Sequence, residues 1–462
     1  MTEEMYVDDL VARSRLALKE CEKLTQHKVD TVAAAIVYTF SRPDVAEYFA
    51  NMALEETHIG KLESKITKLV SKIPSVFYDI KDVKTVGLVE ENKELGIRKL
   101  AKPLGVIAAL VPSTNPEATP LFKGVLGLRG RNTVIFAPHP GSKKTTFMIV
   151  EKMREILEKN GLPKDIFICI DKPSKLTSQL LMAKCDITMA TGSGDMVRAA
   201  YSSGKPAYGV GAGNAAVVVD ETADLTDAAH KIMVGKTGDN ASGCSAENSL
   251  VIKETVYNDM IACLKNEGGY LATEDEKVKL RSVMWVDGHL NRAIVAKPVK
   301  VIADLAGIEI PENTRFIMVE EDGVGKDHPF SGEKLSLVLT LFRYQNFQDA
   351  IDMVNAITRY SGFGHSCGIH SFNEEHIMEL ATKTYTTKVI VRQPHGIANS
   401  GSWNNGLAKT FSLGCGTWGG NIVSENITQK HYINTTWVAE PIDREPATEE
   451  EIYGDLLKDA IL

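Results

Sequence analysis

The feature that most constrains the fold is a series of short, continuous apolar segments between residues 104 and 219. They are rich in β-branched residues, and helical stretches such as 143–160 separate them. Strands that are apolar on both faces and alternate with helices predict a parallel sheet covered on both sides. We therefore expect a doubly wound α/β domain of the kind that binds dinucleotides. The expected strands are 104–111, 132–137, 165–170, 186–190 and 215–219.

The rest of the chain divides around this domain. The first hundred residues have apolar side chains at helical spacing, and a second α/β pattern starts near residue 237. We expect a dinucleotide-binding domain with N-terminal helices over 1–236, a second α/β domain over 237–427, and a C-terminal arm over 428–462. Such an arm is available for contacts between copies of the chain.

Composition excludes several partners. The chain has 52 Lys and Arg against 60 Asp and Glu, a net charge of -8, which disfavours binding to nucleic acid or to an anionic membrane. Its first residues are acidic where a targeting peptide is basic or apolar, and its apolar runs are too short to span a bilayer. Seven cysteines without a CxxC pair fit a reducing cytoplasm. We expect a cytoplasmic protein.

One cysteine stands in a context that favours chemistry. Cys244 lies in the small, polar loop GDNASGCSAENS, just before a β-branched run, and an accessible thiol among polar groups can be a nucleophile. Cys367 and Cys415 lie in Gly-rich loops and remain alternatives. The cysteines expected in the core are Cys169, Cys185 and Cys263.

A second motif suggests a phosphate site. Thr191, Gly192, Ser193 and Gly194 form a turn between an expected strand and an expected helix, which directs backbone N–H groups and a positive helix end towards a ligand. Without a third glycine, the turn alone fits an ordinary strand–helix connection equally well. The loop histidines have no metal-ligand spacing, so we expect no metal.

Together, these segments resemble the CoA-acylating branch of the aldehyde dehydrogenase superfamily. The nearest groups are acylating sulfoacetaldehyde dehydrogenases, acylating succinate semialdehyde dehydrogenases and the aldehyde dehydrogenase half of bifunctional aldehyde–alcohol dehydrogenases. The resemblance spans about residues 5–440 and implies a Rossmann-type cofactor domain with a second, catalytic α/β domain. The matching segments are STNPEATP (113–120), NTVIFAPHP (132–140), ATGSGDMVRAAYSSGKPAYGVGAGN (190–214), the DN…C…E cluster (239–247), EKLS (333–336), GFGH (362–365) and LGCGTWGGNIVSEN (413–426).

The resemblance assigns roles to individual residues. It implies that Cys244 attacks the aldehyde carbonyl, that Asn115 stabilises the oxyanion, and that His365 handles the proton of the CoA thiol. It also implies NAD or NADP as cofactor, CoA as co-substrate and a homo-oligomer, either a dimer or a tetramer. The residues expected at the cofactor are Thr191, Gly192, Ser193, Gly194, His139, Lys143 and Glu333.

Val210 separates this chain from hydrolytic relatives. Those enzymes have a water-activating Glu in an ELGGK motif, and the equivalent stretch here is YGVGAGN, with Val210 in its place. We therefore expect the thioester to be transferred to CoA. An enzyme resembling glutamyl-phosphate reductase, which exchanges the acyl group with phosphate, and a non-catalytic scaffold are the rival interpretations. Glu247 is expected to be structural.

Substrate and cofactor choice depend on a few side chains. Arg392, His395 and Ser242 are expected to line the aldehyde pocket, and a guanidinium favours a substrate with a sulfonate or carboxylate tail. Sulfoacetaldehyde is slightly preferred over succinate semialdehyde, and acetaldehyde or propionaldehyde is a further alternative. Arg392 could instead pair with an acidic neighbour or a CoA phosphate. Lys143 favours NADP, but it also fits a solvated helix turn or a CoA phosphate contact.

Overall fold

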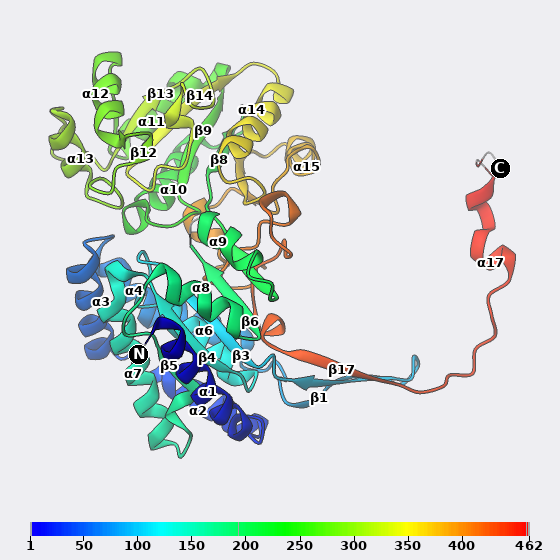
Figure 1. The fold of residues 1–462 in the computed structure, drawn as a ribbon. Helices are drawn as coiled ribbons and strands as arrows, with labels where there is room; N and C mark the ends of the chain where they lie inside the picture. The colour runs from blue at the N-terminus through cyan, green and yellow to red at the C-terminus, as the bar shows by residue number, and fades with distance from the viewer. Residues whose placement is uncertain (1, 193, 459, 461–462) are drawn as a thin grey trace.

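The structure is a computed structural model that describes residues 2–192, 194–458 and 460. Two parallel sheets form two lobes, one above the other in Figure 1. The five-stranded lobe contains the sheet β5-β4-β3-β6-β7, and the seven-stranded lobe contains the sheet β10-β13-β14-β9-β8-β15-β16. Both sheets have helices on both faces, so the predicted α/β architecture is confirmed.

The five-stranded lobe is doubly wound because its strands are apolar on both sides. Along β3, Ile107 and Ala109 enter one core, and Ala108 and Leu110 enter the other. Helices α2, α3, α5, α6 and α7 cover the first face, and α1, α8 and α9 cover the second. The strands are β3 (Val106–Val111), β4 (Thr133–Pro138), β5 (Phe167–Cys169), β6 (Ile187–Thr191) and β7 (Ala207–Val210). The helices are α1 (Glu3–Cys21), α2 (Gln26–Ser41), α3 (Pro43–Thr57), α4 (Leu62–Thr67), α5 (Ile73–Ile80), α6 (Thr119–Arg129), α7 (Lys143–Lys159), α8 (Lys175–Lys184) and α9 (Gly194–Tyr201).

The seven-stranded lobe follows the same principle. Helices α10 to α13 pack on one face of its sheet, and α14 and α15 pack on the other. The strands are β8 (Ala215–Val219), β9 (Glu247–Lys253), β10 (Gly269–Leu271), β13 (Phe316–Glu320), β14 (Val338–Tyr344), β15 (Cys367–His370) and β16 (Val389–Val391), with a small hairpin of β11 (Trp285–Val286) and β12 (His289–Leu290). The helices are α10 (Leu225–Thr237), α11 (Tyr257–Asn266), α12 (Glu274–Met284), α13 (Val299–Ala306), α14 (Phe347–Tyr360), α15 (Glu374–Lys383) and α16 (His395–Ala398).

The change from one lobe to the other comes earlier in the chain than the predicted boundary at residue 236. Strand β8 pairs with β9 and β15, in the seven-stranded sheet, and α10 packs beside it. The chain therefore crosses between Val210, the end of β7, and Ala215, the start of β8. A purely apolar strand such as AAVVV fits either sheet, so sequence pattern alone could not place it.

A third, antiparallel sheet projects from the five-stranded lobe (Figure 1). It pairs β2 (Ile97–Lys102) with both β1 (Gly87–Asn92) and β17 (Asn434–Ala439). Residues 87–102 are thus strands, and the helical expectation for the first hundred residues is wrong there. Their partner β17 lies more than three hundred residues away in the chain, so local periodicity does not reveal the pairing. The arm then continues to the exposed helix α17 (Glu449–Tyr453).

No helix in the described part of the chain has the length and apolar character needed to cross a membrane.

Candidate active site

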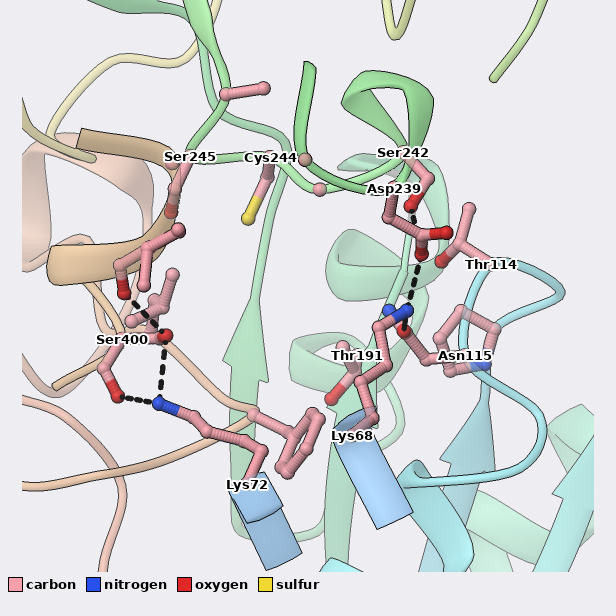
Figure 2. A pocket seen from close by; sticks show the side chains of 18 of the residues that line it. Lys68, Lys72, Thr114, Asn115, Thr191, Asp239, Ser242, Cys244, Ser245 and Ser400 are labelled. Carbon is pink, nitrogen blue, oxygen red and sulfur yellow. Dashed lines mark hydrogen bonds and ion pairs between the residues drawn. The ribbon is translucent and has the colours of Figure 1, made fainter. Parts of the chain in front are cut away.

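A cavity of about 930 Å³ receives residues from both lobes. Cys244 and Ser242 reach it from the loop before β9, and Asn115 reaches it from the loop after β3. The turn between Lys68 and Lys72, which continues α4 into α5, forms another wall. Figure 2 shows the Cys244 side chain pointing into the space that these groups enclose.

The loop that carries the thiol is held in a strained conformation. Asp239, Asn240 and Ala241 have φ values of 47°, 52° and 57°, a left-handed run that costs free energy in residues other than glycine. Specific contacts hold it, because Asn240 Nδ2 donates to two backbone carbonyls at 3.1 Å and the Ser242 hydroxyl donates to Asp239 at 2.8 Å. The strained turn directs Cys244 into the cavity.

The Cys244 thiol faces a histidine. His365 Nε2 lies 3.2 Å from Cys244 Sγ. Burial, followed by Glu333, raises the pKa of Cys244 to about 12. Burial, followed by Lys388, lowers the pKa of His365 to about 3. The resting pair is therefore a neutral thiol and a neutral imidazole.

Behind this pair lies a buried hydrogen-bond network. His365 Nδ1 lies 2.8 Å from the Ser366 hydroxyl. Asn399 Nδ2 donates to Ser366 Oγ at 2.9 Å and to Ser245 Oγ at 3.0 Å. Because Ser245 follows Cys244 in the chain, Asn399 connects the histidine and the thiol loop. This arrangement fixes the imidazole ring in contact with the sulfur.

Asn115 is positioned by a cation. Lys68 Nζ donates to Asn115 Oδ1 at 2.5 Å and pairs with Asp239 Oδ2 at 2.5 Å (Figure 2). Glu117 lies 3.6 Å from the same ammonium. Burial lowers the pKa of Lys68, but Asp239 and Glu117 outweigh it, so the pKa is raised and Lys68 stays charged.

Most of the residues that are expected to bind the cofactor lie on one side of the cavity. Thr191, Gly192, Gly194, His139 and Glu333 all line the cavity, whereas Ser193 lies outside the described residues. An added Cβ at Gly194 would meet no atom within 4 Å, so the backbone borders open space that a pyrophosphate could approach. These residues fit a dinucleotide.

Glu333 reaches this side of the cavity from the seven-stranded lobe. Its carboxyl accepts the Gly213 N–H at 3.2 Å. Burial raises its pKa to about 8, so the group is largely protonated at neutral pH. In that protonated form the carboxyl can both donate and accept a hydrogen bond at this side of the cavity.

Lys143 is the exception among the expected cofactor residues. It is exposed at the start of α7 and does not line the cavity. The neighbouring N–H groups of Lys144 and Thr145 already donate to the Glu56 carboxylate, at 2.8 and 2.7 Å. The position is therefore a solvated helix start that is capped by a carboxylate.

Of the three residues expected at the aldehyde, the structure brings only Ser242 to the cavity. Arg392 donates to the Ser371 carbonyl at 2.5 Å and stacks on Phe372 at 4.7 Å, so its expected contact with the substrate is wrong. His395 is buried behind the thiol loop, where Nδ1 lies 2.7 Å from the Ser245 carbonyl. Arg392 and His395 thus both contact other parts of the protein. They follow the end of β16 in the seven-stranded lobe, before the chain reaches the cavity.

Glu247 supports the same loop. Its carboxylate accepts the His395 N–H at 2.7 Å, and burial raises its pKa to about 8. It does not line the cavity.

The alternative nucleophiles Cys367 and Cys415 are buried, and neither lines the cavity. Cys244, which is partly exposed at the cavity, has the better access.

Sequence reasoning missed several groups at the site. Lys68 and Lys72 come from helices assigned only to packing, and Ser366 and Asn399 from loops noted for other residues. Lysines four residues apart on an amphipathic helix are ordinary surface residues, so the sequence contains no signal that distinguishes these two.

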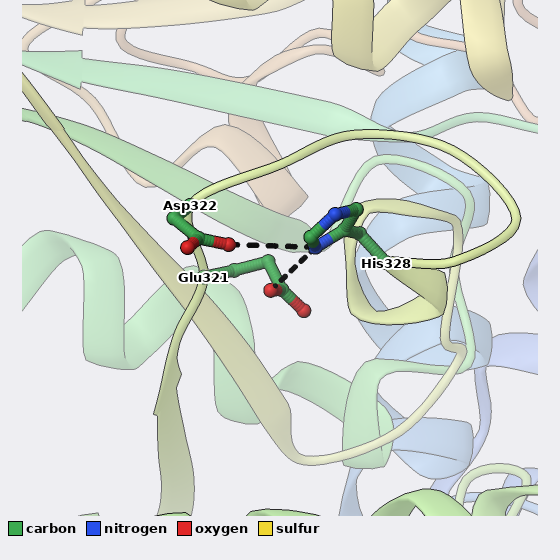
Figure 3. A group of neighbouring side chains, drawn as sticks. All are labelled: Glu321, Asp322 and His328. Atoms are coloured by element: carbon green, nitrogen blue, oxygen red, sulfur yellow. Dashed lines mark hydrogen bonds and ion pairs between the residues drawn. The ribbon is translucent and has the colours of Figure 1, made fainter.

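One further cluster lies away from the cavity. Glu321, Asp322 and His328 bring their side chains within 4.8 Å of one another (Figure 3). Glu321 is already paired with Lys277 at 3.3 Å and with His328 at 2.9 Å. We interpret the cluster as a surface ion-pair network.

Comparisons with known proteins agree with this geometry. The pattern of the aldehyde dehydrogenase family matches residues 3–279. The chain is 42% identical to the sulfoacetaldehyde dehydrogenase (acylating) of Bilophila wadsworthia, covering 98% of each chain. It is 40% identical to the succinate-semialdehyde dehydrogenase (acetylating) of Clostridium kluyveri, covering 94% of this chain and 96% of the relative. The crystal structure of an acetylating aldehyde dehydrogenase from Geobacillus thermoglucosidasius superimposes with a TM-score of 0.93 at 35% identity, over 96% of this chain and 98% of that one. The chain belongs to the aldehyde dehydrogenase family, in its CoA-acylating branch.

Proposed function

We propose that the protein oxidises a small anionic aldehyde to its acyl-CoA, with NAD(P)+ and CoA, through a thioester on Cys244. The observation that carries the proposal is a cavity-lining thiol in contact with the buried His365 imidazole, with Val210 in place of the water-activating Glu of hydrolytic relatives. Of the carboxylates among the described lining residues, Asp239 is bound to Lys68, Glu333 is largely protonated at neutral pH, and Glu63 is exposed. Val210 is buried in the core.

The residues account for each proton and bond. Cys244 Sγ forms a bond to the aldehyde carbon, and its proton passes to His365 Nε2. The Asn115 amide and the Cys244 N–H donate to the new oxyanion, and donors of this kind are typically worth about a hundredfold or more in rate. NAD(P)+ supplies the hydride acceptor when it is bound, which leaves a thioester on Cys244. His365 releases its proton to solvent and then takes the proton of the CoA thiol, whose sulfur adds to the thioester carbon. Cys244 departs as the leaving group and recovers that proton from His365.

The preferred aldehyde is sulfoacetaldehyde, with succinate semialdehyde as the alternative. Relatives at 42% and 40% identity carry the corresponding names, and both aldehydes have an anionic tail. NADP is slightly preferred as cofactor, although the capped start of α7 gives Lys143 no contact with the cavity. We further propose that copies associate through the arm 428–462, where Trp437 of β17 is exposed.

The proposal is tested by following NAD(P)H formation with sulfoacetaldehyde, succinate semialdehyde, acetaldehyde and propionaldehyde, with and without CoA. We expect one turnover per active site without CoA, and mass spectrometry should find the acyl group on Cys244. Phosphate in place of CoA should not restore turnover. Sustained release of free acid without CoA, or turnover with phosphate, would contradict the proposal.

A further inference from the structure

We propose that Lys72 forms the subsite for the anionic tail of the aldehyde, and that it selects sulfonate- or carboxylate-bearing substrates. This inference rests on the proposed function and adds the group that recognises the substrate. Lys72 lines the cavity that contains Cys244. In Figure 2, Lys72 and Lys68 border the lower side of the space into which the Cys244 sulfur points.

Lys72 differs from Lys68 and Lys409, two other cations of the cavity, in its charge balance. Lys68 is paired with Asp239, and Lys409 is paired with Asp79 at 2.6 Å. Lys72 Nζ instead donates to neutral oxygens of Ser400 and Gly401, and among the described residues it forms no ion pair. All three ammonium protons are donated to neutral acceptors, so an anion would take the place of one of them. Asp79, whose charge also acts on Lys72, is paired with Lys409.

The environment of Lys72 favours the binding of an anion next to its ammonium group. Burial, followed by the charge of Lys409, lowers the pKa of Lys72 to about 8. A half-buried cation gains more from an opposite charge than an exposed one does, because the surrounding dielectric is low. An incoming sulfonate or carboxylate would restore the missing counter-charge.

The position of the ammonium is already fixed before any ligand arrives. Lys72 Nζ lies 2.9 Å from the Ser400 carbonyl, 3.1 Å from its hydroxyl and 2.6 Å from the Gly401 carbonyl. Lys72 also ends the π-helical turn Lys68–Lys72, a local geometry that is frequent at functional sites. A held side chain loses little further entropy on binding.

The lining carboxylates do not cancel this charge. Asp239 is committed to Lys68, Glu63 is exposed at the edge, and Glu333 belongs to the side of the cavity assigned to the cofactor. Arg392, the other cation considered for this role, lies outside the cavity. Arg292 also lines the cavity, but it is exposed and its charge acts on His139, on the side assigned to the cofactor. Among the described lining residues, Lys72 is therefore the half-buried cation without an ion pair that the cavity offers to an anionic tail.

The first experiment compares Lys72→Gln with the wild type on sulfoacetaldehyde, succinate semialdehyde and the uncharged butyraldehyde. Losing a charge-assisted contact should lower kcat/KM for the anionic aldehydes by about ten- to a hundredfold relative to butyraldehyde. Lys72→Arg should keep most of the selectivity because it keeps the charge. Arg392→Gln is the matched control, since it removes a cation that lies outside the cavity, and it should leave the ratio unchanged.

A second measurement needs no variant and covers the case in which Lys72→Gln does not fold. Ethanesulfonate should inhibit butyraldehyde oxidation by the wild type competitively with the aldehyde, and the uncharged 1-propanol should not. Lack of inhibition, inhibition that competes with CoA, or equal losses for charged and uncharged aldehydes in Lys72→Gln would overturn the role of Lys72. Wild-type enzyme that makes no acyl-CoA from any aldehyde would instead refute the proposed function.

Discussion

The Lys68 ammonium donates to the Asn115 side-chain carbonyl at 2.5 Å. This contact occupies the oxygen end of the amide and leaves its nitrogen, Nδ2, as the donor for the cavity. In the mechanism that we propose, the oxyanion needs a donor at that point, so a residue of the N-terminal helices would fix which end of Asn115 faces the reaction. Lys68 acts through Asn115 and is a positioning residue.

Lys68→Met should therefore slow the reaction of every aldehyde to a similar extent. We expect kcat/KM to fall by about tenfold or more for charged and uncharged aldehydes alike, because Asn115 loses its fixed orientation. Steady-state kinetics of Lys68→Met, Asn115→Ala and the double variant should show losses that do not add, since both changes remove the same donor. Additive losses, or a loss confined to anionic aldehydes, would contradict this role.

Cys244→Ala should abolish acyl-CoA formation and leave the fold and cofactor binding intact. The reason is that the sulfur forms the covalent bond to the substrate, whereas the side chain contributes little to the core. Activity, circular dichroism and cofactor titration measure the three properties. Cys415→Ala is the control, and a loss of activity there with activity retained in Cys244→Ala would identify a different nucleophile.

Ser366→Ala should weaken proton transfer without removing the imidazole. His365 Nδ1 lies 2.8 Å from Ser366 Oγ, and losing that partner frees the ring to rotate away from the thiol. We expect kcat to fall by about tenfold or more and its pH profile to shift, with KM for CoA little changed. Ser366→Thr, which keeps the hydroxyl, should recover part of the rate. An unchanged pH profile would make Ser366 a packing residue only.

The buried Glu247 carboxyl should make stability depend on pH. Its pKa rises from 4.5 to about 8 on folding because of burial, so between these values the folded protein holds a proton that the unfolded chain releases. The free energy of unfolding from this group should therefore fall as pH rises, by up to about 1.4 kcal/mol per pH unit. Urea unfolding at several pH values between 4.5 and about 8 gives the free energy of unfolding as a function of pH. This free energy should fall less steeply with pH in Glu247→Gln than in the wild type. An identical slope in both proteins would contradict the assignment.

Much of the fold could be predicted from the sequence because burial leaves a local pattern. The apolar segments at residues 104–111 and 132–137 became neighbouring central strands, β3 and β4, as their two-sided apolar character requires. Strands β1 and β2 were missed because β1 is largely exposed, β2 is mostly half-buried, and the pairing of β2 with β17 is distant in the chain. Such pairing leaves no periodic signal within either segment.

The sequence likewise predicted some residues of the candidate site and not others. Cys244, Asn115 and Glu333 lie in distinctive loops, and the structure brings all three to one cavity. Arg392 was misplaced because a sequence does not reveal in which direction a loop side chain points. Lys72 was missed because its importance depends on which cations have carboxylate partners, and that property exists only after folding.

Two of the segments in which the chain passes between the lobes border the cavity. The first runs from Val210 to Ala215, and the second follows α16 and includes residues 400–411, after which Ile427 and Tyr432 pack in the core of the five-stranded lobe. Any hinge motion between the lobes must bend one or both of these segments and thereby reshape the walls around the thiol. Ligand binding and the angle between the lobes are therefore coupled. A molecule that binds more tightly to the conformation with one interlobe angle shifts the protein towards that conformation.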